Sequence, residues 1–147
     1  MHNISFFSAN GNFNLGNAQL AEGTNAGTIK TTAATDFVVN GYTYSKAATD
    51  NITVTAGAVQ ANLTTCMYLV TIETDGDVVV TKGTEQVTGS GKDLLWPAIP
   101  DNSAVLGAIK VVSSGATFTA GTTDLGAGTV TDTYYNFFTP PTFVLQA

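Results

Sequence analysis

The sequence predicts an all-β protein, folded as an antiparallel β-sandwich or a jelly-roll-like barrel. About seven or eight short runs rich in β-branched and aromatic residues are separated by turn residues. Two of the turns carry the Asn-Gly and Asp-Gly dipeptides that favour tight hairpins. No segment sustains a helical period over more than two turns.

The two hairpins are the clearest local predictions. Residues 36–39 and 42–45 flank Asn40-Gly41, which supplies the positive φ angles of a type I′ turn. A longer apolar run at 66–72, expected to be a central strand, turns through Asp75-Gly76 into a strand at 78–82.

The remaining strands are expected at residues 52–55, 104–112, 117–119 and 129–135. Gly107 interrupts the second of these runs and predicts a bulge or a close backbone approach. Residues 83–91 and 121–128 are expected to be loops. Residues 92–96 could form one helical turn, and 18–22 and 56–62 are the best candidates for short helices.

Both ends of the chain differ from this pattern. Residues 1–32 lack a sustained period but carry scattered apolar side chains, so they are expected to form an extended N-terminal arm. Residues 33–135 are expected to form the β-sandwich body, and 136–147 an aromatic, proline-bearing tail. Exposed apolar ends on a compact body favour docking onto a partner or a symmetric neighbour. The expected partner-binding residues are Phe6, Phe7, Phe13, Leu15, Phe137, Phe138 and Phe143.

Composition argues against several classes of function. Five lysines, no arginine and eleven acidic residues give a net charge of −6, and only 11% of residues are charged. Because a duplex-binding protein needs a basic face, no nucleic-acid partner is expected. No window approaches the roughly 20 apolar residues of a membrane span, and no secretory signal is visible, so no membrane partner is expected either.

The counts of cysteine and histidine give no basis for a catalytic or metal site. Cys66 is the single cysteine and lies in an apolar run, which indicates a small buried residue. His2 is the single histidine and lies beside the terminus, so neither a Ser-His-Asp arrangement nor a zinc site is expected. We therefore expect no enzyme activity, no metal and no cofactor.

Two other residue groups have a functional and a structural interpretation. Glu73, Asp75 and Asp77 alternate around one turn and could offer oxygens to calcium, although the spacing of a calcium loop is missing and simple turn chemistry suffices. Aromatic side chains could stack against sugar or could pack in the core and at interfaces. These aromatic residues are Tyr42, Tyr44, Trp96, Tyr134 and Tyr135.

The carboxylates Asp36, Asp50 and Asp132 have no spacing that links them as the acid and base of a glycosidase.

Three blocks of sequence carry a resemblance to a known class of protein. These are residues 37–50, residues 97–100 with 104–111, and residues 115–125. In this order they resemble small virion proteins of tailed bacteriophages, over roughly residues 28–135. The resemblance implies a capsid decoration (cement) protein on the outer surface of the virion, bound to the major capsid protein and often trimeric.

The resemblance and the apolar ends together give a working hypothesis. A body that self-associates, expected as a homotrimer, would use its arm and tail to reach neighbouring subunits or the shell, where many weak contacts add up. Deleting residues 1–27 is then expected to abolish particle binding and leave the body folded. The alternative is a tail-fibre or spike adhesin that contacts host carbohydrate, although fibre shafts usually carry repeats and none is visible here.

Overall fold

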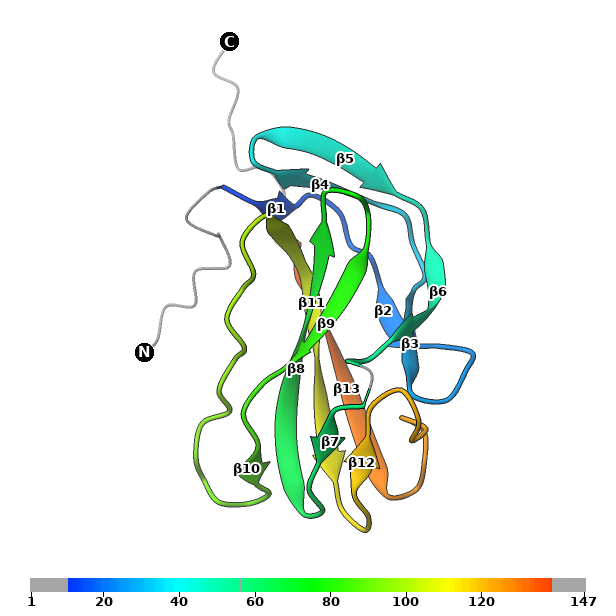
Figure 1. Ribbon diagram of the computed structural model, residues 1–147, viewed down its shortest axis with the longest axis vertical. Coiled ribbons are helices and arrows are strands. Elements are labelled where there is room, and N and C mark those ends of the chain that lie inside the picture. Colours follow the sequence, from blue (N-terminus) through cyan, green and yellow to red (C-terminus); the bar gives the residue numbers. More distant parts are fainter. Residues whose placement is uncertain (1–10, 56, 139–147) are drawn as a thin grey trace.

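The computed structural model describes residues 11–55 and 57–138, and within them every regular element is a β-strand (Figure 1). The predicted fold class is confirmed, because the strands pair antiparallel throughout and pack as a β-sandwich. The strands are β1 (Phe13–Asn14), β2 (Leu20–Glu22), β3 (Thr28–Thr31), β4 (Thr35–Val39), β5 (Tyr42–Lys46), β6 (Thr49–Thr53), β7 (Val59–Gln60), β8 (Thr64–Glu73), β9 (Val78–Lys82), β10 (Gln86–Val87), β11 (Ser103–Ser113), β12 (Phe118–Thr119) and β13 (Val130–Asn136).

The main sheet is built on the two longest strands, β8 and β11. Its order is β10-β8-β11-β13, and β9 pairs with β8 beyond β10 on the same side. Both central strands are buried along nearly their whole length, in keeping with the continuous apolar runs at these positions. The predicted central strand at 66–72 is therefore confirmed and is three residues longer than expected.

Two smaller sheets, β1-β4-β5 and β2-β3-β6, provide the rest of the sandwich (Figure 1). Ile29, Phe37 and Ile52 from these sheets pack into one apolar core with Tyr68 and Ile109 of the main sheet. A two-residue pair of strands, β7 and β12, lies near the start of β8 and adds Phe118 to the same core.

The predicted hairpins are confirmed at their turns. Asn40 and Gly41 have φ angles of 53° and 81°, as a type I′ turn between β4 and β5 requires. Between β8 and β9, the Glu73 amide donates to the Asp77 carbonyl at 3.0 Å, and Gly76 takes a φ of 86°.

The predicted irregularity at Gly107 is a β-bulge. The register between β11 and β8 shifts between Val105 and Gly107. A Cβ atom at Gly107 would lie 2.1 Å from the Tyr135 carbonyl oxygen and 2.6 Å from Leu20 Cδ1. Glycine is required here because the neighbouring backbone leaves no space for a side chain.

The expectation of an arm over residues 1–32 is wrong for the described part of that segment. Residues 13–31 contain β1, β2 and β3, which pair with one another or with β4 and β6. Ala18, Leu20 and Ile29 are 0–5% exposed and belong to the core. The body therefore begins near residue 11 rather than at 33, and residues 1–10 lie outside the described residues. These strands have two to four residues each, too few to show a period, and their partner strands satisfy their backbone groups.

The short helices suggested by the sequence are also absent from the described residues. Residues 20–22 form β2, residues 59–60 form β7, and Leu95 makes an isolated bridge with Thr84 instead of a helical turn. Pro97 and Pro100 favour extended backbone before them, and the bridge supplies a partner to that extended chain. The expected loop at 83–91 contains the short strand β10.

Candidate functional site

The expected partner-binding residues that the structure describes lie where the chain enters and leaves the body. Asn14 Nδ2 donates to the Phe137 carbonyl at 2.9 Å, and Asn136 Oδ1 accepts from the Leu20 amide at 2.7 Å. These two hydrogen bonds hold the first strands beside the end of β13. The described chain therefore begins and ends at one end of the molecule.

The four described members of the expected set differ in exposure. Phe137 donates its amide to the Leu106 carbonyl at 3.0 Å, and its ring lies 5.9 Å from that of Trp96, so it packs on the body. Phe13 and Leu15 are half-buried, whereas Phe138 is 50% exposed. Phe6, Phe7 and Phe143 lie outside the described residues.

Sequence reasoning missed a second group of exposed apolar side chains, remote from the termini. Leu63 and Val87 are 58% and 65% exposed, and the Thr88 amide donates to the Leu63 carbonyl at 2.9 Å, so the two lie together. The sequence signal that could have indicated these exposed side chains is an apolar residue inside a turn-rich segment. The large exposed apolar residues of the described chain are Tyr42, Val59, Leu63, Val79, Val87, Leu95, Tyr135 and Phe138.

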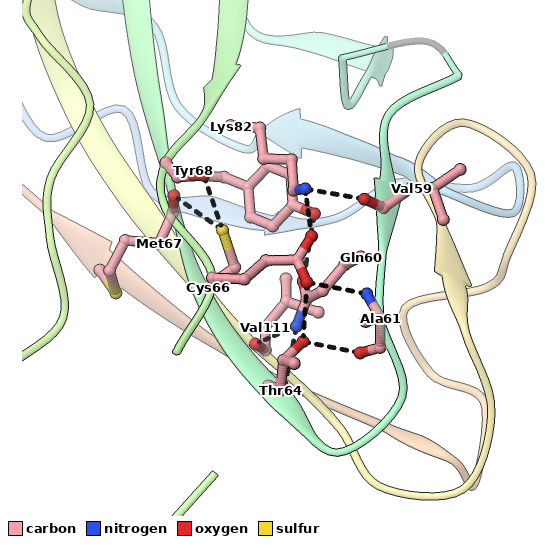
Figure 2. Close-up of polar contacts among 11 residues, drawn as sticks. Val59, Gln60, Ala61, Thr64, Cys66, Met67, Tyr68, Lys82 and Val111 are labelled. Atoms are coloured by element: carbon pink, nitrogen blue, oxygen red, sulfur yellow. Dashed lines mark hydrogen bonds and ion pairs between the residues drawn. The ribbon is translucent and has the colours of Figure 1, made fainter. Parts of the chain in front are cut away.

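A buried polar network joins β7 to β8 and β11 (Figure 2). Gln60 is completely buried; its Nε2 donates to the carbonyls of Thr64 and Val111, each at 3.0 Å, and its Oε1 accepts from the Tyr68 hydroxyl at 3.1 Å. Because every polar atom of this amide is paired, the network stabilises the short strand β7 against the main sheet rather than leaving a reactive group.

An ion pair completes the network at its exposed side. Lys82 pairs with Glu85 and also donates to the Val59 carbonyl at 2.7 Å, while Glu85 accepts from the Ala61 amide at 3.0 Å. Partial burial raises the pKa of Glu85, but the hydrogen bonds from Lys82 and Ala61 outweigh it and hold the pKa below its ordinary value. These contacts stabilise the turn between β7 and β8.

Cys66 and Tyr68 are not activated as nucleophiles. Both side chains are completely buried. Burial raises the pKa of the Cys66 thiol to about 11, and it raises the pKa of Tyr68 as well. Since the thiolate is the reactive form, Cys66 is a packing residue, as its sequence position indicated.

The five aromatic residues considered for sugar binding do not form one platform. Tyr44 stacks on Phe37 at 5.4 Å, Tyr134 packs against the core, and Trp96 packs on Phe137. Tyr42 is 70% exposed on β5 and Tyr135 is 38% exposed on β13, in different sheets.

The acidic turn formed by Glu73, Asp75 and Asp77 is organised as a turn. Asp75 Oδ1 accepts from the Asp77 amide at 2.9 Å, and the Glu73 carbonyl accepts from the Gly76 amide at 3.0 Å. The described residues contain no group of three or more side chains placed to hold a metal ion. Turn formation therefore accounts for the geometry of this motif.

Asp50 and the pair formed by Glu22 and Asp124 lie in different surroundings. Asp50 accepts hydrogen bonds from the hydroxyl and amide of Thr24, and these lower its pKa. Glu22 and Asp124 both accept from the Gly126 amide, at 2.7 and 3.0 Å. The hydrogen bond between these two carboxyl groups, with partial burial, raises the pKa of Glu22.

Two shallow hollows open on the described surface, with volumes of about 240 Å³ and about 390 Å³. The first lies between β10, the loop after it and β11; the second lies between β6 and the β8–β9 turn.

Among the described residues, no helix is long and apolar enough to cross a membrane. No family model, curated protein or solved structure matches this chain.

Proposed function

We propose that this protein is a structural component of a tailed-phage virion that decorates and stabilises the capsid. In this proposal it binds the major capsid protein on the outer surface of the shell and acts as an oligomer, expected to be a homotrimer. The sequence resemblance over roughly residues 28–135 motivates the proposal.

The observation that carries the proposal is that the first and last described segments of the chain are hydrogen-bonded to each other. Asn14 and Phe137 are joined by a hydrogen bond of 2.9 Å, and Phe6, Phe7 and Phe143 lie further along the sequence, outside the described residues. Exposed Phe138 adds an apolar side chain at that end. Two apolar segments that start side by side can contact one partner together.

The physical role of a cement protein agrees with this arrangement. Such a protein needs contact area rather than chemistry, and each fully buried Phe contributes roughly 1.5–3 kcal/mol. Many identical copies on one shell make individually weak contacts effective. The rigid sandwich would hold the two apolar segments at a fixed origin.

The proposal is tested by binding to undecorated heads of the phage that encodes the chain. Full-length protein and the variants Phe6→Ser/Phe7→Ser and Phe138→Ser are mixed with heads and sedimented. We expect the first variant to lose at least tenfold in affinity, since about 1.4 kcal/mol corresponds to a factor of ten. Val59→Ser, an exposed apolar position remote from the termini, is the matched control and should bind as the unmodified protein does.

Equal binding by all three variants would overturn the role of the chain ends. Failure of the unmodified protein to bind heads would overturn capsid decoration itself. The adhesin alternative is favoured by the 70% exposure of Tyr42, and binding to a glycan array that is lost in Tyr42→Ala would support it instead.

A further inference from the structure

The outer face of the main sheet carries a positively charged hollow, which we call the lysine hollow. It is lined by Lys92, Lys110, Thr65, Thr88, Val87 and Leu94, among others, and has a volume of about 240 Å³. Its floor is the surface of β8 and β11, where Thr65 pairs with Val112, and the Thr65 and Thr88 hydroxyls hydrogen-bond at 3.0 Å.

The charge of this hollow contrasts with that of the chain. Two of the five lysines line it, although the net charge is −6. No carboxylate is among the lining residues, and the ion pair found in the described part of the chain is Lys82–Glu85, elsewhere. A hollow lined by one sign of charge concentrates ligands of the opposite sign.

The rim of the hollow indicates a protein ligand rather than a small anion. Val87 is 65% exposed, and Leu63, linked to Thr88 through its carbonyl, is 58% exposed. Leu63 also has a φ of 59°, in the left-handed region that a bulky residue rarely adopts. Exposed apolar side chains on and beside the strand that borders the hollow are expected where a protein partner makes contact.

The same chain carries a surface of complementary chemistry at the other end of β8. The acidic turn presents Asp75 and Asp77 to solvent, and Val79, which follows closely, is 36% exposed. Val79 pairs with Thr71, which places it on the same outer face as Thr65. Lys46 Nζ lies near this turn, 3.6 Å from where a Cβ atom of Gly76 would stand, and offsets only part of its charge.

The two surfaces cannot meet within one molecule. Thr65 and Glu73 lie near opposite ends of β8, about 27 Å apart along the strand. We propose that the lysine hollow of one copy binds the acidic turn of a second copy, with Val79 packing against the lining residue Leu94. This inference deepens the self-association part of the proposed function and does not involve the shell.

The energetics assign separate roles to the charges and to the apolar side chains. An exposed ion pair contributes little to affinity and weakens as salt is added. Burial of the valine and leucine side chains supplies the salt-independent part of the contact. The charges then determine which surfaces meet and in what register.

Two arrangements satisfy these contacts. A second copy laid antiparallel on the same face makes both contacts at once around a two-fold axis. A head-to-tail arrangement makes one contact per interface and can close into a ring. The molar mass in solution distinguishes a dimer from a larger ring.

The experiment uses full-length protein and light scattering after size exclusion, at about 0.05 M and about 0.5 M salt. We expect oligomers at low salt and at least a tenfold weaker association at high salt. Lys92→Glu/Lys110→Glu and Asp75→Lys/Asp77→Lys should each be monomeric, and their equimolar mixture should associate again. Lys30→Glu and Asp36→Lys, charge reversals at residues that neither line the lysine hollow nor belong to the acidic turn, are matched controls and should behave as the unmodified protein does.

Unaltered association of the charge-reversed variants would overturn the inference, and so would no association in their mixture. If Lys110→Glu, on a central strand, impairs folding by circular dichroism, Lys92→Glu alone provides the test. A monomer that still decorates heads overturns this inference only. An oligomer that ignores heads overturns capsid decoration only.

Discussion

At the scale of single residues, Glu22 and Asp124 show how tertiary contacts create chemistry that sequence spacing does not reveal. They are far apart in the chain, yet one backbone amide, that of Gly126, donates to both carboxylates. Asp132 also lies close enough for its charge to raise the pKa of Glu22. The proximity of these acids makes this corner of the sandwich sensitive to pH.

The sign of that sensitivity follows from the raised pKa of Glu22. A group whose pKa is raised on folding stabilises the fold below its unfolded pKa, and that contribution is lost as pH rises through the folded pKa. Glu22→Gln keeps an oxygen for the Gly126 amide and removes the charge. We therefore expect it to match or exceed the unmodified protein in stability at about pH 7, and to lose that advantage towards about pH 4.

The measurement is the free energy of unfolding in urea at several pH values. Asp124→Asn removes the largest cause of the raised pKa and should reduce the same component of the pH dependence. A Glu22→Gln curve that runs parallel to that of the unmodified protein at all pH values would contradict this assignment.

At the scale of elements, the sequence patterns that correctly predicted the structure are those whose physical cause is local. Asn40-Gly41 determines its turn through its own φ angles, and the run at 66–72 is long enough to show burial on both faces. The short strands β1, β2, β3, β7 and β10 were missed because two to four residues cannot display a period. Apart from the β2–β3 pair, these strands have their hydrogen-bond partners in distant parts of the chain.

The bulge at Gly107 gives the sharpest prediction at this scale. In Gly107→Ala the new Cβ atom would meet the Tyr135 carbonyl oxygen at 2.1 Å, so β13 or β11 must shift. We expect a loss of about 3 kcal/mol or more in the free energy of unfolding. Chemical denaturation followed by tryptophan fluorescence provides the measurement.

Gly128→Ala is the matched control, since nothing lies within 4 Å of the added atom. Its stability should stay within about 0.5 kcal/mol of the unmodified protein. Similar losses in the two variants would show that the packing at the bulge is not the cause.

At the scale of the whole molecule, the segment before residue 33 belongs to the fold. Leu20 and Ile29 are each worth roughly 1.5–3 kcal/mol of burial, and β3 is the ladder partner of β6. Those contributions are comparable with the net stability of about 5–15 kcal/mol of an ordinary domain.

Truncation tests this directly. A chain starting at residue 11 should unfold cooperatively, as the full chain does, because every described strand is retained. A chain starting at residue 28 lacks β1 and β2 and should lose cooperative unfolding, as seen by near-ultraviolet circular dichroism and calorimetry. Cooperative unfolding of the shorter chain would instead support the arm expected from the sequence.

The sequence by itself determined the fold class, the long strands, the two hairpins and the bulge at Gly107. Each depends on neighbours along the chain, whose spacing and φ preferences act locally. Only the tertiary structure decided that residues 13–31 complete the core, that Asn14 and Phe137 lie together, and that Lys92 and Lys110 share one hollow. These features depend on which distant segments pair, and pairing is decided by burial and backbone hydrogen bonding over the whole chain.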